Sequence, residues 1–273
     1  MDAAREILNT YTYVPTLNQM GYMSPALDEI QMAFVEHCEN NPHGNFLDIG
    51  CGFGVATLPV VNRGCRIVAC DLEQQHLDVL KKSISRKRLP LVTFIKGHFP
   101  NEVTFPENHF DGINLSMVIH FLSAPLIEKA LRNIFIYLKE GGRLFITTSS
   151  PYQKVLSPFL PIYEKKRLAE EWPGYIRDIG DYVPHRAHLL PRENIVFCKD
   201  ELSRLVSKFN FRVKDSLFFS REAIPQDLAL DGREYSGVIC EKPKKSVALL
   251  EKCRETIPTN EAKIRQSEGA KAF

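Results

Sequence analysis

The sequence lacks an excess of charge of one sign, since 35 lysines and arginines stand against 33 aspartates and glutamates. Domains built mainly to bind nucleic-acid backbones usually carry a clear basic excess, so a net charge of +2 weighs against that class. The most basic stretch, residues 81–98, falls mostly at the end of an expected helix, where the helix dipole and water favour cations. We therefore do not expect a nucleic-acid partner.

The sequence also lacks the cysteine patterns of disulfide scaffolds and zinc sites. Its seven cysteines include no CxxC pair and no cluster with histidine at ligand spacing, which favours free thiols in a reducing compartment. His185 and His188 stand three residues apart, but prolines flank them and no carboxylate has ligand spacing. We expect no metal.

Long apolar runs are missing as well. Residues 112–127 carry no charge, but a proline and several polar side chains interrupt them, so the stretch is too short and too polar to cross a bilayer. The first ten residues contain acids and no apolar run, and no signal peptide is recognisable there. These features predict a cytoplasmic protein without a membrane partner.

What the chain does contain is a regular alternation of strands and helices. Short apolar segments at 45–50, 65–71, 91–97, 110–118 and 143–149 are typical of buried strands, and helical patterns separate them at 52–64, 72–87 and 124–140. A helix at 200–211 and strands at 211–220 and 234–242 follow. This order predicts an α/β fold with a mostly parallel sheet.

Two further helix boundaries are suggested by local signals. Ser24 followed by Pro25 predicts a helix that begins at residue 24 and ends near residue 40. Gly141 and Gly142 are expected to end the helix at 124–140, because glycine after a lysine-bearing last turn is a common helix stop.

The alternation divides the chain unevenly. We predict an N-terminal cap segment at 1–44, a main domain at 45–242 and a charged tail at 243–273. Within the main domain, residues 151–199 lose the alternation and hold six prolines, four tyrosines and the only tryptophan. We interpret these residues as an inserted substrate cap.

A glycine-rich loop stands between the first strand of the main domain and the helix after it. Residues 47–54 read LDIGCGFG, and glycines there let the chain turn sharply and bring its backbone close to a ligand. Asp71 ends the next strand, 21 residues after Gly50, and a carboxylate at that sheet edge suits the two hydroxyls of a ribose. The spacing predicts a nucleoside-containing cofactor.

Two common nucleotide-binding loops do not match. A dinucleotide-binding loop has the pattern G-x-G-x-x-G, which counted from Gly50 requires a glycine at position 55. This chain has Val55 there, and its third glycine comes one position early, at Gly54. A P-loop needs Gly-Lys-Ser or Gly-Lys-Thr, and neither follows. A nicotinamide-dependent oxidoreductase is therefore disfavoured.

The pattern D-x-G-x-G-x-G from Asp48, with an acid at the end of the next strand, resembles the class I S-adenosylmethionine-dependent methyltransferases. Residues 96–111 and 138–146 are similar to two further motifs of that family. The resemblance implies a Rossmann-like sheet of seven strands in the order 3-2-1-4-5-7-6, with only strand seven antiparallel. It also implies S-adenosylmethionine as the cofactor.

The same resemblance implies which residues hold that cofactor. The loop would hold its methionine part, with Ser116 nearby. Asp71 would hold the ribose, while Leu72, His98 and Phe99 would contact the adenine. The family often has aspartate where His98 stands, although a neutral imidazole nitrogen can also accept the bond from the adenine amino group. The predicted set is Asp48, Gly50, Cys51, Gly52, Gly54, Asp71, Leu72, His98, Phe99 and Ser116.

His120 is the candidate catalytic residue, because it follows the fourth strand of the main domain at the same sheet edge. Imidazole titrates near neutral pH and can take a proton from a hydroxyl or amine acceptor. The alternative is a histidine that caps the next helix or fills space below the cofactor. The sequence leaves both interpretations open.

Aromatic residues gather in the two segments outside the predicted sheet. Their rings make apolar walls with polar tips, which suit an enclosed site for an organic substrate. Each ring could equally pack in the cap's own small core. The residues predicted to contact a substrate are Tyr11, Tyr22, Tyr152, Trp172 and Tyr175.

Together these features predict an enzyme that moves a methyl group from S-adenosylmethionine to an oxygen or nitrogen of a small organic molecule. We expect a monomer or a homodimer. A methyltransferase acting on RNA or protein, a non-catalytic cofactor-binding module and a nicotinamide-dependent oxidoreductase are the alternatives. No motif names the acceptor atom or the substrate.

Overall fold

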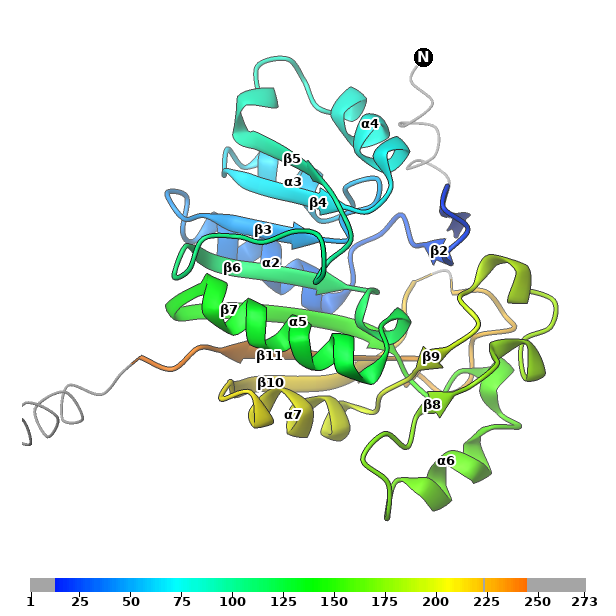
Figure 1. Cartoon of the computed structure of the whole chain (residues 1–273). Helices are drawn as coiled ribbons and strands as arrows, with labels where there is room; N and C mark the ends of the chain where they lie inside the picture. Colours follow the sequence, from blue (N-terminus) through cyan, green and yellow to red (C-terminus); the bar gives the residue numbers. More distant parts are fainter. Residues whose placement is uncertain (1–12, 223, 245–273) are drawn as a thin grey trace, which may run out of the picture. The chain divides into compact units, whose positions relative to one another are not determined.

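The computed structural model describes residues 13–222 and 224–244, so Tyr11 and nearly all of the predicted tail lie outside the described residues. The centre of the fold is a seven-stranded sheet (Figure 1). Its strands are β3 (Phe46–Ile49), β4 (Ile67–Asp71), β5 (Val92–Lys96), β6 (Phe110–Ser116), β7 (Leu138–Ser149), β10 (Arg212–Phe219) and β11 (Tyr235–Glu241).

These strands lie in the order β10-β11-β7-β6-β3-β4-β5. Neighbours from β7 to β5 are parallel, whereas β11 is antiparallel to both β7 and β10. Counted from β3 as strand one, this is the order 3-2-1-4-5-7-6 with only strand seven reversed. The predicted fold class is confirmed.

Helices cover both faces of the sheet. α2 (Glu29–Glu39), α3 (Thr57–Asn62) and α4 (Gln74–Ser83) pack on one face, and α5 (Ala124–Tyr137) and α7 (Lys199–Lys208) on the other (Figure 1). Along β7, Leu144 and Ile146 join the core under α5, while Phe145 between them joins the core under α2. Because side chains alternate across a sheet, a strand covered on both faces is buried throughout, as β3 is.

The N-terminal helix begins later than predicted. The Asp28 carboxylate accepts the backbone N–H of Gln31 at 2.9 Å, and Gln31 Oε1 accepts the Asp28 N–H at 3.1 Å. This reciprocal capping box starts α2 directly after Asp28. The hydroxyl of Ser24, before Pro25, accepts the N–H of Ala26 at 3.3 Å instead. The predicted start at residue 24 is therefore wrong.

Two boundaries near glycines also differ from the prediction. The helix expected at 52–64 is shortened to α3, because Gly52 and Gly54 have positive φ angles that a right-handed helix excludes. β7 begins at Leu138, so Gly141 and Gly142 lie inside the strand and do not end a helix. The register between β6 and β7 shifts there, and Gly141 has a φ of +81°. The glycines form an irregularity of the strand.

The remaining segments lie at the carboxyl ends of the parallel strands (Figure 1). The first is a hairpin of β1 (Val14–Pro15) and β2 (Tyr22–Met23). Residues 151–199 form 3₁₀ turns, α6 (Leu160–Lys166) and a ribbon of β8 (Tyr175–Ile176) and β9 (Asn194–Ile195). A small core that includes Tyr152, Phe159 and Tyr163 holds this cap together.

No helix within 13–222 and 224–244 has the length and apolar character needed to cross a membrane. The six cysteines in these ranges are free and buried. Cys253, the seventh, lies outside the described residues.

Candidate active site

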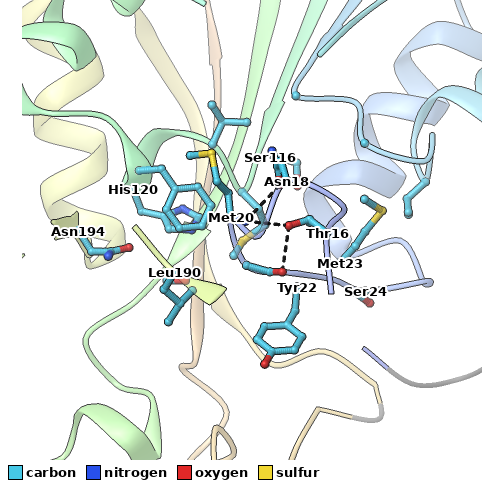
Figure 2. Close-up of a pocket in the computed structure, with 18 of the residues that line it drawn as sticks. Thr16, Asn18, Met20, Tyr22, Met23, Ser24, Ser116, His120, Leu190 and Asn194 are labelled. Atoms are coloured by element: carbon cyan, nitrogen blue, oxygen red, sulfur yellow. Dashed lines mark hydrogen bonds between the residues drawn. The ribbon is translucent and has the colours of Figure 1, made fainter. Parts of the chain in front are cut away.

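A pocket opens at the carboxyl ends of β3, β4 and β6. The glycine loop and the residues after β6 form one wall, and the β1–β2 hairpin with the cap forms the opposite one. Figure 2 shows hairpin residue Met20 between Ser116 and His120, with Leu190 and Asn194 of the cap on the side of His120 and Met23 on the opposite side. The two segments outside the sheet therefore wall the same cavity as the glycine loop.

The glycine loop turns so tightly that three of its residues have left-handed backbone angles. Gly50, Gly52 and Gly54 have φ of +70°, +52° and +89°, a region that residues with a side chain disfavour. A Cβ at Gly50 would collide with Val118, and one at Gly52 would collide with Met23 of the hairpin. The backbone angles at all three positions, and the close approach of Val118 at Gly50, therefore favour glycine in this loop.

Asp48 is buried behind the loop. Its carboxylate accepts hydrogen bonds from the Thr57 hydroxyl at 2.7 Å and from the Asn114 side-chain amide at 2.8 Å. Burial raises the pKa of Asp48, and these two bonds oppose the shift. Asn114 also lines the pocket, and its buried Oδ1 has no hydrogen-bond partner in the part of the chain that the structure describes. A ligand with an N–H or O–H donor fits such an acceptor.

Asp71 is held by three hydrogen bonds. Its carboxylate accepts the backbone N–H groups of Gly52 at 2.8 Å and Glu73 at 2.9 Å, and it lies 3.0 Å from His76 Nδ1. His76 Nε2 accepts the N–H of Leu17 in the hairpin at 3.1 Å, so Nδ1 carries the ring proton that is donated to Asp71. The acid expected to bind a ribose is thus oriented by the loop and connected to the hairpin.

Sequence reasoning missed His76. The one signal that could have found it is its position in the first turn of α4, five residues after Asp71. Its ring is buried and packs edge-on against Phe53 of the glycine loop.

Nine of the ten residues predicted for the cofactor line this pocket. The exception is Gly54, where a Cβ would point at Leu80 of α4. His98 is in the pocket wall, and its backbone N–H donates to Glu102 at 2.9 Å. The contacts that these residues make with a cofactor stay predictions.

His120 lines the same pocket but has only 4% of its surface exposed. Its Nδ1 lies 3.4 Å from the Thr148 hydroxyl, and its ring packs on Phe121. Burial, with the positive charge of Arg221, lowers the pKa of His120 to about 3. So weak a base stays neutral near pH 7 and accepts protons poorly, which favours the space-filling alternative. The catalytic role stays a prediction.

Among the aromatic residues predicted to contact a substrate, Tyr22 lines this pocket. Tyr152 is buried in the cap core, because its ring finds apolar neighbours there. Trp172 and Tyr175 line a separate depression beside the start of α5. The structure thus brings one of the four described aromatics to the cavity, and Tyr11 lies outside the described residues.

A buried ion pair beside the pocket was also missed. Arg221 follows β10, and its Nη2 donates to Asp28 Oδ2 at 2.6 Å. The guanidinium lies 4.5 Å over the ring of Tyr235, whose hydroxyl is 3.1 Å from that of Tyr13. Arg221, Tyr235 and Tyr13 all line the pocket. No sequence pattern joins Arg221 and Asp28, which are 193 positions apart.

Within the described ranges, no three His, Cys, Asp or Glu side chains come together in a way that could hold a metal ion. His185, one of the two histidines considered above, lies 3.0 Å from an oxygen of Asp227.

Known proteins share sequence with the first part of the sheet domain. Residues 46–142 match the model of a methyltransferase domain. Over 108 residues the chain is 37% identical to a cypemycin N-terminal methyltransferase from Streptomyces, covering 38% of this chain and 42% of that protein. It is 34% identical over 104 residues to a demethylmenaquinone methyltransferase from Paenarthrobacter aurescens, covering 38% of each. The chain thus spans about two fifths of the length of these relatives.

Solved structures share the fold at low identity. An S-adenosylmethionine-dependent methyltransferase from Methanosarcina mazei has a TM-score of 0.57 at 15% identity, covering 81% of this chain and 100% of that one. A 1,6-didemethyltoxoflavin-N1-methyltransferase from Burkholderia thailandensis has a TM-score of 0.52 at 20% identity, covering 78% and 79%.

The strand order and the solved structures give this chain the Rossmann-like fold of the class I methyltransferases, and its glycine loop and Asp71 lie within the part that matches a methyltransferase domain. The match to a methyltransferase domain covers residues 46–142.

Proposed function

We propose that this chain transfers a methyl group from S-adenosylmethionine to an oxygen or nitrogen of a small organic molecule. The observation that carries the proposal is a single pocket that joins the glycine loop and Asp71 to a space walled by the hairpin and the cap. One end suits a nucleoside cofactor. Side chains of the hairpin and the cap line the other end, and these side chains belong to no recognised motif.

The residues at the first end fit the cofactor. Asp71 offers carboxylate oxygens to the ribose hydroxyls. The unpartnered Asn114 Oδ1 can accept a hydrogen bond from the ammonium group. Leu72 and Phe99 supply apolar surface for the adenine ring. The donor and acceptor chemistry at this end therefore agrees with S-adenosylmethionine.

The bound cofactor supplies an electrophilic methyl group, so the protein has mainly to align an acceptor with it. The hairpin contributes by enclosing the pocket with Met20, Tyr22 and Met23 (Figure 2), which limits the access of water. We propose that Tyr22 contacts the acceptor. His120, which stays neutral near pH 7, would contact it through a hydrogen bond.

A small acceptor is favoured because the hairpin and the cap wall the pocket opposite the glycine loop. Of the two relatives described above, one is named a cypemycin N-terminal methyltransferase and one a demethylmenaquinone methyltransferase, so their names do not share one acceptor. The enclosure leads us to propose the small molecule.

Calorimetric titration with S-adenosylhomocysteine tests the cofactor claim. We expect the wild type to bind and Asp71→Ala to lose about tenfold or more in affinity, because the ribose hydroxyls lose a charged acceptor. Asp78→Ala is the matched control, since Asp78 is exposed on α4 and its carboxylate accepts a bond from the nearby Gln74. That variant should bind like the wild type.

No binding at high micromolar concentration, or equal affinities for Asp71→Ala and Asp78→Ala, would contradict the proposal. Transfer of an isotope-labelled methyl group to a metabolite pool, followed by mass spectrometry of the product, then identifies the acceptor atom.

A further inference from the structure

The pocket separates its charged side chains by sign. Asp48 and Asp71 are the only acids among the described residues that line it, and both belong to the cofactor end. The guanidinium groups in its wall, Arg186 and Arg221, come from the cap and from the loop after β10. An acceptor bound at that end meets fixed positive charge.

The two arginines differ in their surroundings. Arg186 donates from Nη2 to Asp227 at 2.5 Å, and that aspartate is partly open to solvent. Arg221 is only 8% exposed, and its Nε has no hydrogen-bond partner among the residues that the structure describes. A guanidinium has five N–H donors, so Arg221 keeps donors for a ligand. Away from water each such bond is strong.

Asp28 pairs with Nη2 of Arg221, whereas Nε has no partner among the described residues. Its carboxylate is shared between the Arg221 guanidinium, the backbone N–H of Gln31 and, at 3.2 Å, the Thr147 hydroxyl. Arg221 lines the pocket and Asp28 does not. The ion pair therefore anchors a guanidinium that lines the pocket.

We propose that Arg221 forms an oxyanion-binding subsite at the acceptor end of the pocket, and that the acceptor is a small organic acid. Its carboxylate, phenolate or enolate oxygen accepts hydrogen bonds from the guanidinium. The inference rests on the methyltransferase function proposed above and narrows its acceptor class.

An acceptor held as an oxyanion needs no base from the protein. An electron pair of the oxyanion forms the bond to the methyl carbon. The carbon–sulfur bond breaks and its electron pair stays on sulfur, so an anion and a sulfonium become two uncharged groups. No proton has to leave before the new bond forms. This agrees with a pocket wall in which His120 is a weak base.

The alternative is that Arg221 and Asp28 only join α2 to the end of β10. Both interpretations predict lost stability for Arg221→Met, so stability alone does not separate them. Asp28→Asn separates the two interpretations. Asparagine caps a helix as well as aspartate does, but it leaves Arg221 without its counter-charge. A guanidinium that faces a ligand then binds an anion more tightly.

The test is calorimetry on the full chain saturated with S-adenosylhomocysteine, with benzoate against benzamide and ionised 4-nitrophenolate against 4-nitroanisole. In the wild type we expect the anion of at least one pair to bind about tenfold more tightly than its neutral partner. Arg221→Met should bring the ratio of the anion's affinity to that of its neutral partner to about one, and Asp28→Asn should raise this ratio. Arg212→Met is the control, because the Arg212 side chain is exposed and pairs with Glu241, and it should leave this ratio unchanged.

A wild-type ratio near one in both pairs, no anion binding at millimolar concentration, or a ratio that survives Arg221→Met would overturn the subsite. If Arg221→Met does not fold, Asp28→Asn decides, and an unchanged or weaker anion preference overturns the proposal. Absence of S-adenosylhomocysteine binding in the wild type would count against the proposed function. Normal binding of it without anion preference would count against the subsite alone.

Discussion

His120 shares the pocket wall with Arg221, and its hydrogen-bond contact, Thr148, lies 28 positions further along the chain. The folded protein disfavours the charged imidazole because burial removes water and Arg221 adds a like charge. In the unfolded chain the ring returns to its ordinary pKa. Folding stability is therefore linked to pH through this one side chain.

We expect acid to destabilise the wild type more than His120→Gln. The folded-state pKa of about 3 lies below the ordinary value of 6.5, so the unfolded state takes up the extra proton as pH falls below 6.5. Stability is lost from there down to about pH 3, and about 2 kcal/mol of it is lost between pH 7 and pH 5. Urea denaturation of both proteins across this range measures the difference.

His43→Gln, at an exposed position, is the control and should keep the wild-type pH dependence. If the free energy of unfolding falls equally with pH in the wild type and in His120→Gln, the linkage is refuted. The same His120 variant tests the predicted base. At saturating cofactor, an ionisation missing from its pH–rate profile supports that role, and an unchanged profile removes it.

At the scale of elements, α2 packs against β6, β7 and β11. Ile30 of the helix is fully buried and lies over Gly237 in the middle of β11. A Cβ at Gly237 would overlap Ile30 Cγ1. This glycine therefore sets how closely the helix approaches the sheet, and through Asp28 it helps position Arg221.

Gly237→Ala should lower the free energy of unfolding by about 1–3 kcal/mol, because the added methyl group overpacks this contact. Combined with Ile30→Ala, which removes the overlapping atoms, the loss should be smaller than the sum of the two single losses. Urea denaturation of the four proteins in the cycle measures the coupling.

Ile127→Ala supplies the matched cycle, since Ile127 of α5 is equally buried in the core on the other face of the sheet. There we expect additive losses with Gly237→Ala. Additivity in the Ile30 cycle as well would show that the helix is not limited by this glycine.

At the scale of the whole molecule, the cap and the sheet share buried contacts. Tyr163 of α6 is fully buried and donates its hydroxyl to Glu201 at 2.8 Å. Glu201 also accepts the backbone N–H of Cys198 at 3.0 Å, which caps α7. Phe218 of β10 packs against the cap core. We therefore expect the cap to unfold together with the sheet.

Tyr163→Phe should lower the unfolding temperature while keeping a single transition. The change leaves one Glu201 oxygen buried without its donor, which costs about 1–3 kcal/mol, or about 2–4 °C for each kcal/mol in a domain of this size. Calorimetric melting measures both features. Tyr182→Phe, at a half-buried ring of the same cap, is the control and should melt like the wild type.

A second transition at lower temperature in Tyr163→Phe would mean that the cap unfolds by itself. In that case the pocket wall formed by the cap would be separable from the sheet that carries the glycine loop and Asp71.

Local patterns in the chain were sufficient to predict the sheet and the residues at the glycine-loop end of the pocket. Glycines at positive φ, an acid at a strand end and alternating apolar segments each act over a few residues, and the family resemblance ordered the strands. Boundaries failed where a stronger local signal competed, as the Asp28 capping box did with Ser24 and Pro25.

The acceptor end depended on packing between segments far apart in the chain. Two of its contacts join segments that are far apart in the chain, namely Leu17 with His76 and Asp28 with Arg221. A third feature, the burial of Tyr152, arises within the irregular cap. A side chain there points into the cavity or into a core according to which neighbours the fold brings to it, and no periodic pattern records that choice.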